Sequence, residues 1–314
     1  MNIRLLDILH NSEVREPIAF QGVHIAPLIG PSSRSRAYLT LAEAYAKEGV
    51  AIGESSNSGT VAELLMTNRL DADVLLIDGE ELVGARQNRV LNATALVGPH
   101  ATVTLPVSCV ERGRWHYDTR AMALSGNLEF AASRARKVAS VSGSLRKTGT
   151  YGSAQHEVWE SVDQVLGDLG SRSRTSAMRE AYVARADELA DYVEAFPPQV
   201  GQTGALVAVR GRWVAMEWFS HPDVYAHFAP QLIRSHAAQV IGRSAAATVR
   251  APAMSAAEAF ESTLRVDGVT YAGIGKGETV RFQDNRWQGA ALSFEEQVLH
   301  GVLFRHESTD RIEP

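Results

Sequence analysis

The stretch ATVTLPVSCV, residues 101–110, has the clearest strand pattern in the chain. Every second position carries an apolar side chain, at Val103, Leu105, Val107 and Cys109. This period of two places the four side chains on one face of a β-strand, which is typical of a sheet that covers a core. Shorter segments of the same kind precede it, and residues 1–118 are therefore predicted to be β-rich.

One short helix interrupts this part of the chain. In LTLAEAYAKEG, residues 39–49, Thr40 and Glu43 have the spacing of a capping box, and Gly49 is suited to end a helix. After residue 118 the apolar residues recur at helical spacing, over 158–169 and again over 178–193. Between the helical segments, SVSGSLRKTGTYGS at 140–153 is rich in Ser and Gly and is predicted to form a mobile basic loop.

Strand patterns return after residue 200. Strands are predicted at 204–219, 264–272, 278–283, 287–293 and 297–305, with helices across 222–241 and 255–262. We therefore predict an α+β fold, in which β-rich N- and C-terminal parts form sandwich- or barrel-like sheets around a helical middle. The three segments, 1–118, 119–199 and 200–314, are expected to pack as one compact unit.

The composition is that of an ordinary globular protein. The 314 residues include 31 Lys and Arg and 36 Asp and Glu, which gives a net charge of −5. A single Cys excludes an intramolecular disulfide framework and a Cys-rich zinc site. No stretch approaches about 18 apolar residues, so no membrane span is predicted. The mild acidity argues against nucleic-acid binding, and with no secretory leader pattern we expect a cytoplasmic location.

The most unusual segment is DVLLIDGEELVGARQNRVLN, residues 73–92. An apolar strand runs into three closely spaced carboxylates, Asp78, Glu80 and Glu81, and these are followed by the polar residues Gln87, Asn88, Arg89 and Asn92. A half-buried strand would alternate polar and apolar residues, but here polar groups fall on both faces. Burying such groups costs several kcal/mol unless each is hydrogen-bonded. The segment is therefore either a binding or catalytic site or a buried polar network that secures the fold.

A second polar segment, PVSCVERGRW, covers residues 106–115. Glu111 lies in register with the apolar positions and is a candidate catalytic carboxylate, and Arg114 is a candidate ligand contact. Cys109 is predicted to be a buried apolar residue rather than a nucleophile. Between Phe130 and His156 the chain has basic residues but no Asp or Glu, so Arg146 is a candidate contact for an anionic ligand; the alternative is a solvated surface.

The sequence shows no metal-binding or nucleotide-binding signature of the familiar kinds. The ten His have no metal-ligand spacing, so no metal site is predicted, although carboxylates that hold Mg²⁺ stay possible. Glu217 lies among aromatic residues, and it is either an acid or base with a raised pKa or a paired group. GIGKGET at 273–279 lacks the ending of a phosphate loop and is predicted to be a hairpin turn.

Several of these segments together resemble a known family. They are DGEELVGARQNRVLN at 78–92, PVSCVERGRW at 106–115, QHEVWESV at 155–162, GALVAVRGRWVAMEWF at 204–219 and the helix from Leu232 to His236. The chain resembles the ADP-ribosylglycohydrolase- and rhodanese-phosphatase-associated protein domain family over most of its length. The resemblance implies a context of ADP-ribose and NAD-derived metabolites, and it implies no agreed catalytic set.

Three functions follow as hypotheses. The first is an enzyme that hydrolyses an ADP-ribose- or NAD-derived nucleotide, with a carboxylate from Asp78, Glu80, Glu81 or Glu111 and with phosphate or ribose held by the polar residues that follow. The second is a non-catalytic module that binds or senses the same nucleotide. The third is an assembly protein in which the polar segment is structural and an apolar aromatic surface drives formation of a homo-oligomer. Trp213, Trp218 and Phe219 would supply this surface, although we expect them to pack internally.

Overall fold

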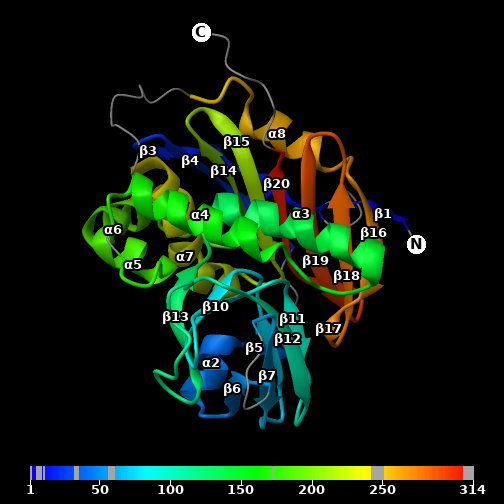
Figure 1. Ribbon diagram of the computed structural model, residues 1–314. Helices are drawn as coiled ribbons and strands as arrows, with labels where there is room; N and C mark the ends of the chain where they lie inside the picture. Colours follow the sequence, from blue (N-terminus) through cyan, green and yellow to red (C-terminus); the bar gives the residue numbers. More distant parts are fainter. Residues whose placement is uncertain are drawn as a thin grey trace.

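The computed structural model describes residues 2–4, 9, 11–31, 35–55, 61–171, 173–241 and 251–306. Within them the chain forms two β-rich lobes, and helices cover the larger one (Figure 1). The α+β class predicted from the sequence is confirmed, with strands at both ends of the chain and most helices in the middle. None of the described helices combines the length and the apolar character needed to span a lipid bilayer.

The large lobe is built on a sheet of ten strands that joins the two ends of the chain. Its order is β1-β16-β18-β19-β20-β15-β14-β4-β2, and β3 also pairs with β4. The strands are β1 (Asn2–Arg4), β2 (Glu13–Val14), β3 (Ile18–Phe20), β4 (Val23–Ile29), β14 (Gln202–Val209), β15 (Arg212–Phe219), β16 (Asp267–Ala272), β18 (Glu278–Gln283), β19 (Trp287–Phe294) and β20 (Gln297–Arg305). The predicted N- and C-terminal segments therefore share one sheet rather than forming separate layers.

Both faces of the ten-stranded sheet are covered. Ile25 and Val207 face one apolar core, and Ala26 and Leu206 face another, as the two-residue period of a strand requires. The first core lies under five helices: α3 (Ala131–Thr148), α4 (Gln155–Asp168), α5 (Met178–Ala184), α6 (Ala186–Ala195) and α7 (Pro222–Ile241). The second lies under α8 (Ala256–Thr263), on the opposite face of the sheet.

The small lobe holds two further sheets and lies below the large sheet in Figure 1. The six-stranded sheet has the order β13-β9-β10-β12-β7-β6, from β6 (Val50–Glu54), β7 (Glu63–Asn68), β9 (Glu80–Gly84), β10 (Arg89–Leu91), β12 (Thr102–Cys109) and β13 (Met122–Leu128). The four-stranded sheet has the order β17-β11-β8-β5, from β5 (Tyr38–Thr40), β8 (Asp73–Leu76), β11 (Ala95–Val97) and β17 (Ile274–Gly275). The two sheets share one apolar core, to which helix α2 (Leu41–Ala46) adds Leu41.

The local predictions that rested on capping and on strand period are confirmed. Thr40 and Glu43 form the predicted capping box at the start of α2, and 101–110 contains β12. Cys109 is fully buried, and the turn around Gly273 is closed by a hydrogen bond from its N–H to the Gly277 carbonyl.

One sequence prediction about the surface is wrong. The first half of SVSGSLRKTGTYGS is not a loop, because helix α3 runs through to Thr148 and ends at Gly149 in the left-handed conformation. Val141 and Leu145 anchor this helix in the interior, although Ser and Gly surround them in the sequence. Trp213, Trp218 and Phe219 are only 2–3% exposed and pack in the two cores of the large lobe, as expected, so they do not supply the surface that the assembly hypothesis requires.

Candidate functional site

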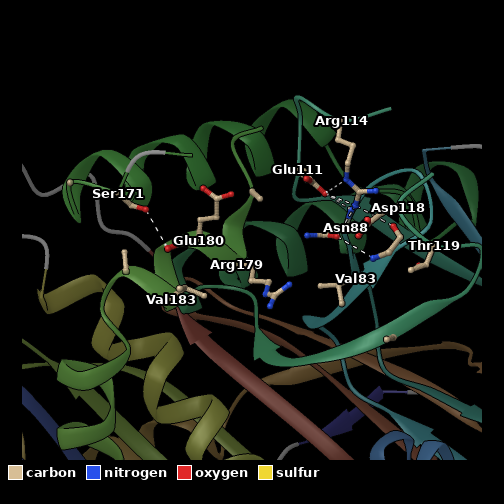
Figure 2. Close-up of a pocket in the computed structure, with 15 residues that line it drawn as sticks. Val83, Asn88, Glu111, Arg114, Asp118, Thr119, Ser171, Arg179, Glu180 and Val183 are labelled. Carbon is tan, nitrogen blue, oxygen red and sulfur yellow. Dashed lines mark hydrogen bonds and ion pairs between the residues drawn. The ribbon is translucent and has the colours of Figure 1, made fainter. Parts of the chain in front are cut away.

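A pocket of about 770 Å³ opens between helix α5 and the edge of the six-stranded sheet (Figure 2). Its volume falls in the range typical of small-molecule sites, roughly 300–1,000 Å³. One wall comes from the small lobe and carries Val83, Asn88, Glu111 and Arg114. The other comes from α5 and carries Arg179. The pocket thus contains three of the residues singled out in the sequence, brought together from separate segments.

Glu111 is the centre of a hydrogen-bonded network on the small-lobe wall. Arg114 donates to Glu111 Oε2 from Nε at 3.0 Å and from Nη2 at 2.7 Å, and the Asn88 N–H donates to the same oxygen at 3.1 Å. Thr175 Oγ1 donates to Oε1 at 2.9 Å. Burial opposes ionisation of Glu111, but these donors and the Arg114 charge lower its pKa below the ordinary value. Glu111 is therefore a carboxylate at neutral pH.

Glu81 differs from Glu111 in that its surroundings raise its pKa. It precedes Val83 by two positions on β9, so both side chains leave the same face of the strand and Glu81 lies beneath the pocket wall. Its side chain is fully buried, and Asn127 Nδ2 donates to Oε2 at 3.3 Å. Oε1 has no hydrogen-bond partner among the described residues. Burial raises the Glu81 pKa to about 7, although Asn127 and Arg179 act in the other direction.

Arg179 supplies positive charge inside the pocket. Figure 2 shows its side chain extending from α5 toward the wall that carries Val83 and Asn88. Within the described part of the chain Arg179 makes no ion pair, so its guanidinium is available to a ligand in the pocket. A guanidinium matches the paired oxygens of a phosphate or a carboxylate.

Two further predicted contacts, Gln87 and Arg89, lie behind the wall rather than in it. Gln87 Nε2 donates to the Glu111 carbonyl at 2.9 Å, and Arg89 Nη1 donates to Gln87 Oε1 at 3.1 Å. Arg89 is fully buried, and its Nε and Nη2 atoms have no hydrogen-bond partner among the described residues. The pair therefore supports the position of Glu111. Cys109 lies beside it, and burial raises the pKa of its thiol, as expected for an apolar Cys.

Asp78 belongs to a separate buried cluster at the junction of the two lobes. Arg134 of α3 donates to Asp78 at 3.1 Å and to Glu217 of β15 at 2.9 Å, both from Nη2. His300 of β20 contacts Glu217 through Nε2 at 2.9 Å. Burial would raise the Asp78 pKa, but Arg134 and the neighbouring cations lower it to about 2. Asp78 is thus a permanently ionised partner of Arg134, and Glu217 is a paired group rather than an acid with a raised pKa.

The remaining predicted residues do not line the pocket. Glu80 Oε2 accepts from the Ile77 N–H at 2.7 Å, and burial raises the Glu80 pKa to about 8, so it closes the turn before β9. Asn92 bridges Ser108 and the Tyr151 carbonyl, and it is 2% exposed. Arg146, at the end of α3, donates to Gln283 of β18 at 2.7 Å on the surface of the large lobe. The four predicted carboxylates thus separate: Glu111 lines the pocket, and Glu81 is buried behind its wall.

Sequence reasoning missed Arg179 and Asn127. Arg179 lies in RTSAMREAYVAR, where a single basic residue on an amphipathic helix carries no signal of its own. Asn127 lies on β13, within an irregularity in the pairing with β9 that no residue pattern predicts. Arg134 was visible only as part of a basic stretch without carboxylates. Its partners proved to be carboxylates from other elements, so the segments 78–92 and 134–147 do meet.

No group of three or more His, Cys, Asp and Glu side chains in the described ranges is placed to hold a metal ion. The polar groups that line the candidate site are carboxyl, amide, hydroxyl and guanidinium groups.

The comparisons with known proteins give a family and no nearer relative. A search of curated proteins and a search of solved structures each return no match. The model of one family matches residues 11–304, which include the elements from β2 to β20, except the last residue of β20, and the whole pocket. The chain belongs to the family described as the ARG and Rhodanese-Phosphatase-superfamily-associated Protein domain.

Proposed function

We propose that the pocket between α5 and β9 is the active site of a hydrolase that acts on an ADP-ribose- or NAD-derived nucleotide. One observation carries this proposal: Glu111, which lines the pocket, and Glu81, which is buried behind the pocket wall, are carboxyl groups whose pKa values their surroundings move apart. Glu111 is held ionised, whereas Glu81 titrates near neutral pH. Such a pair is the usual arrangement of an acid and a base in hydrolytic sites.

The roles follow from the positions of the charges. Arg179, which faces the cavity, binds the phosphates of the nucleotide, and Arg114 adds to the positive potential of the opposite wall. Hydrolysis of an N-glycosidic bond requires one group that takes a proton from water and one that gives a proton to the leaving group. Glu111, ionised in the pocket lining, is suited to take the proton from water, and Glu81, with a pKa of about 7, is suited to supply the proton to the leaving group.

The family supports the choice of substrate class. Its description associates it with ARG and with rhodanese-phosphatase proteins, and this association is consistent with a context of ADP-ribose metabolism. An association of this kind bears on the substrate and leaves the reaction to be tested at the site itself.

The experiment uses the full chain and two pocket variants, Glu81→Gln and Arg179→Ala. Matched controls are Glu13→Gln and Arg15→Ala, which remove the same charges from an exposed ion pair on the large sheet. Each protein is incubated with ADP-ribose, NAD and nicotinamide mononucleotide, with and without magnesium, and products are separated by chromatography. Thermal unfolding of each variant verifies that it is folded.

We expect the wild type and both controls to form product from one of these nucleotides. Arg179→Ala should weaken nucleotide binding, and Glu81→Gln should abolish turnover while binding persists. Saturable binding by wild type with no product after long incubation would replace the hydrolase with the non-catalytic binding module. Turnover that survives in both pocket variants would place the reaction elsewhere.

A further inference from the structure

The charged groups that line the pocket between α5 and β9 restrict how many phosphates its substrate can carry. Two of the described lining residues are basic, Arg114 and Arg179, and three are acidic, Glu111, Asp118 and Glu180. The lining therefore has a net charge of −1 and no excess of positive charge to offer to a chain of phosphates. The substrate class depends on which of the two guanidinium groups can contact a ligand.

Arg114 has no donor left for a ligand. A guanidinium carries five N–H groups. Nε and Nη2 of Arg114 donate to Glu111 Oε2 at 3.0 and 2.7 Å, and Nη2 also donates to Asn88 Oδ1 at 3.0 Å. Nη1 donates to the Ala85 carbonyl at 2.8 Å and to the His116 carbonyl at 3.2 Å. Because all five N–H groups have protein acceptors, Arg114 orders the wall and leaves phosphate binding to other groups.

Two donors remain for a ligand, the guanidinium of Arg179 and the side-chain amide of Asn88. Asn88 is only 7% exposed, and its Oδ1 accepts from the Gly84 N–H at 3.2 Å as well as from Arg114. These two bonds identify the oxygen end of the amide, so Nδ2 is the donor end, and it has no acceptor among the described residues. Arg179 extends toward the same wall and makes no ion pair within the described part of the chain (Figure 2). A buried side chain whose donor has no acceptor is rare in a folded protein, and this one lines a pocket.

Arg179 and Asn88 together suit one phosphate group. The guanidinium matches two phosphate oxygens, and the amide supplies a further N–H. The backbone N–H of Asn88 donates to Glu111 Oε2 at 3.1 Å, so the phosphate donor lies next to the carboxylate that takes the proton from water. In a nucleoside monophosphate a single ribose separates the phosphate from the N-glycosidic bond. We propose that the pocket takes a nucleoside monophosphate whose one phosphate is held by Arg179 and Asn88, which narrows the substrate of the hydrolase proposed above and rests on that function.

A pyrophosphate suits this lining less well. Its second phosphate finds no further cation with an unused donor among the described lining residues. Asp118 and Glu180 line the pocket and form no ion pair in the described ranges, so they repel an additional negative charge. Repulsion of this kind, partly screened by water, lowers an affinity by about tenfold.

Isothermal titration of the full chain with adenosine, AMP and ADP tests the proposal, near neutral pH and at about 0.15 M salt. The three ligands share base and ribose and differ only in the number of phosphates. Nicotinamide mononucleotide is a second monophosphate with a different base. A chelator in the buffer prevents a divalent cation from bridging carboxylates and phosphates.

Three variants examine the two donors and the acidic side of the pocket. Arg179→Ala removes the guanidinium. Asn88→Asp replaces the Nδ2 donor by an anion and keeps an oxygen for the Gly84 N–H and for Arg114. Asp118→Asn removes one carboxylate and keeps the shape of the side chain. Thermal unfolding verifies that each variant is folded.

The matched controls are Arg15→Ala and Glu13→Gln, which remove one charge of each sign from an exposed ion pair outside the pocket. We expect wild type and both controls to bind AMP about tenfold or more tightly than adenosine or ADP. Arg179→Ala and Asn88→Asp should bind AMP about as weakly as adenosine. Asp118→Asn should strengthen the binding of ADP more than that of AMP.

Binding of ADP that is as tight as that of AMP would overturn the single-phosphate site, and so would AMP affinity that persists in Arg179→Ala. Absence of saturable binding of both monophosphates would overturn it as well. If a donor variant does not fold, the three ligands on wild type and on Asp118→Asn still decide.

Product formation separates this inference from the hydrolase itself. Selective binding of AMP with no product from any nucleotide would refute the hydrolase and leave the single-phosphate site. Product from ADP-ribose, together with equal binding of AMP and ADP, would refute the single-phosphate site and leave the hydrolase.

Discussion

Replacement of Arg134 by Met is the strongest single perturbation of the junction between the lobes. Arg134 makes four hydrogen bonds there, two to Asp78 and two to Glu217, at 2.9–3.3 Å. It is fully buried, and both carboxylates are 4% exposed. Methionine has a similar length and no charge, so the variant leaves the two anions in place without their shared partner.

The expected loss in the free energy of unfolding follows from the carboxylates that remain buried in the variant. Removing one partner of a buried ion pair costs about 3–5 kcal/mol, because the other charge is left without compensation. His300 still contacts Glu217 in the variant, so the loss falls mainly on Asp78. We therefore expect the free energy of unfolding at neutral pH to fall by about 3–5 kcal/mol.

The pH dependence has a defined sign. In the wild type the Asp78 pKa is lowered to about 2, so its stabilisation is fully present above the ordinary Asp value and is lost as the pH falls through 2. Without Arg134, burial dominates and the folded-state pKa of Asp78 rises above the unfolded value. The destabilisation of Arg134→Met should therefore be largest at neutral pH and smaller in mild acid, where Asp78 takes up a proton.

Urea unfolding followed by circular dichroism, in neutral and in mildly acidic buffer, measures both effects. The double variant Asp78→Asn/Arg134→Met removes the stranded charge and should recover part of the lost stability. A loss below about 1 kcal/mol at neutral pH, the level of an exposed pair, would refute the reasoning. So would a double variant that is no more stable than Arg134→Met.

Three further predictions concern the small lobe. Because the Glu81 pKa is raised to about 7, its contribution to stability is lost as the pH rises through 7. At alkaline pH, Glu81→Gln should therefore unfold at a higher urea concentration than wild type. In mild acid, the two unfolding midpoints should differ less. Gly84→Ala should destabilise by about 1–3 kcal/mol in the same assay, since Gly84 has φ +115° and a Cβ would meet Thr119 Oγ1 at 2.4 Å; stability equal to wild type would contradict this conformation. Thr40→Ala removes the side-chain cap of α2 and should lower the free energy of unfolding by about 1 kcal/mol, whereas Glu43→Gln, which keeps a capping side chain, should lose less.

Local features of the fold could be predicted from the sequence because they depend on near neighbours. The capping box at Thr40 and the strand period of β12 need only a few residues, and both are present. The continuation of α3 through residues 140–148 could not be predicted in this way. Its Ser and Gly content favours a loop, and its stability comes from Val141 and Leu145 packing against elements distant in the sequence.

The candidate site could be predicted in part. Polar residues on both faces of β9 and β10 indicated either a site or a network, and the structure contains both. Glu111 lines the pocket and Glu81 is buried behind its wall, whereas Asp78 joins Arg134. The position of each carboxylate depends on the alternation of side chains along β9 and on partners that are distant in the sequence. Arg134 lies 56 residues from Asp78 and 83 residues from Glu217. No spacing within 78–92 contains that information.

The pairing of β4 with β14 has a consequence for synthesis of the chain. These strands are neighbours in the sheet, yet β14 follows β4 by roughly 180 residues. At about 5–20 residues per second, the ribosome leaves β4 without this partner for about 9–36 s. Except for β17, the strands of the small lobe find their partners within residues 38–128, so this lobe is able to fold during the wait. The ten-stranded sheet is complete last, when β20 pairs with β15 and β19.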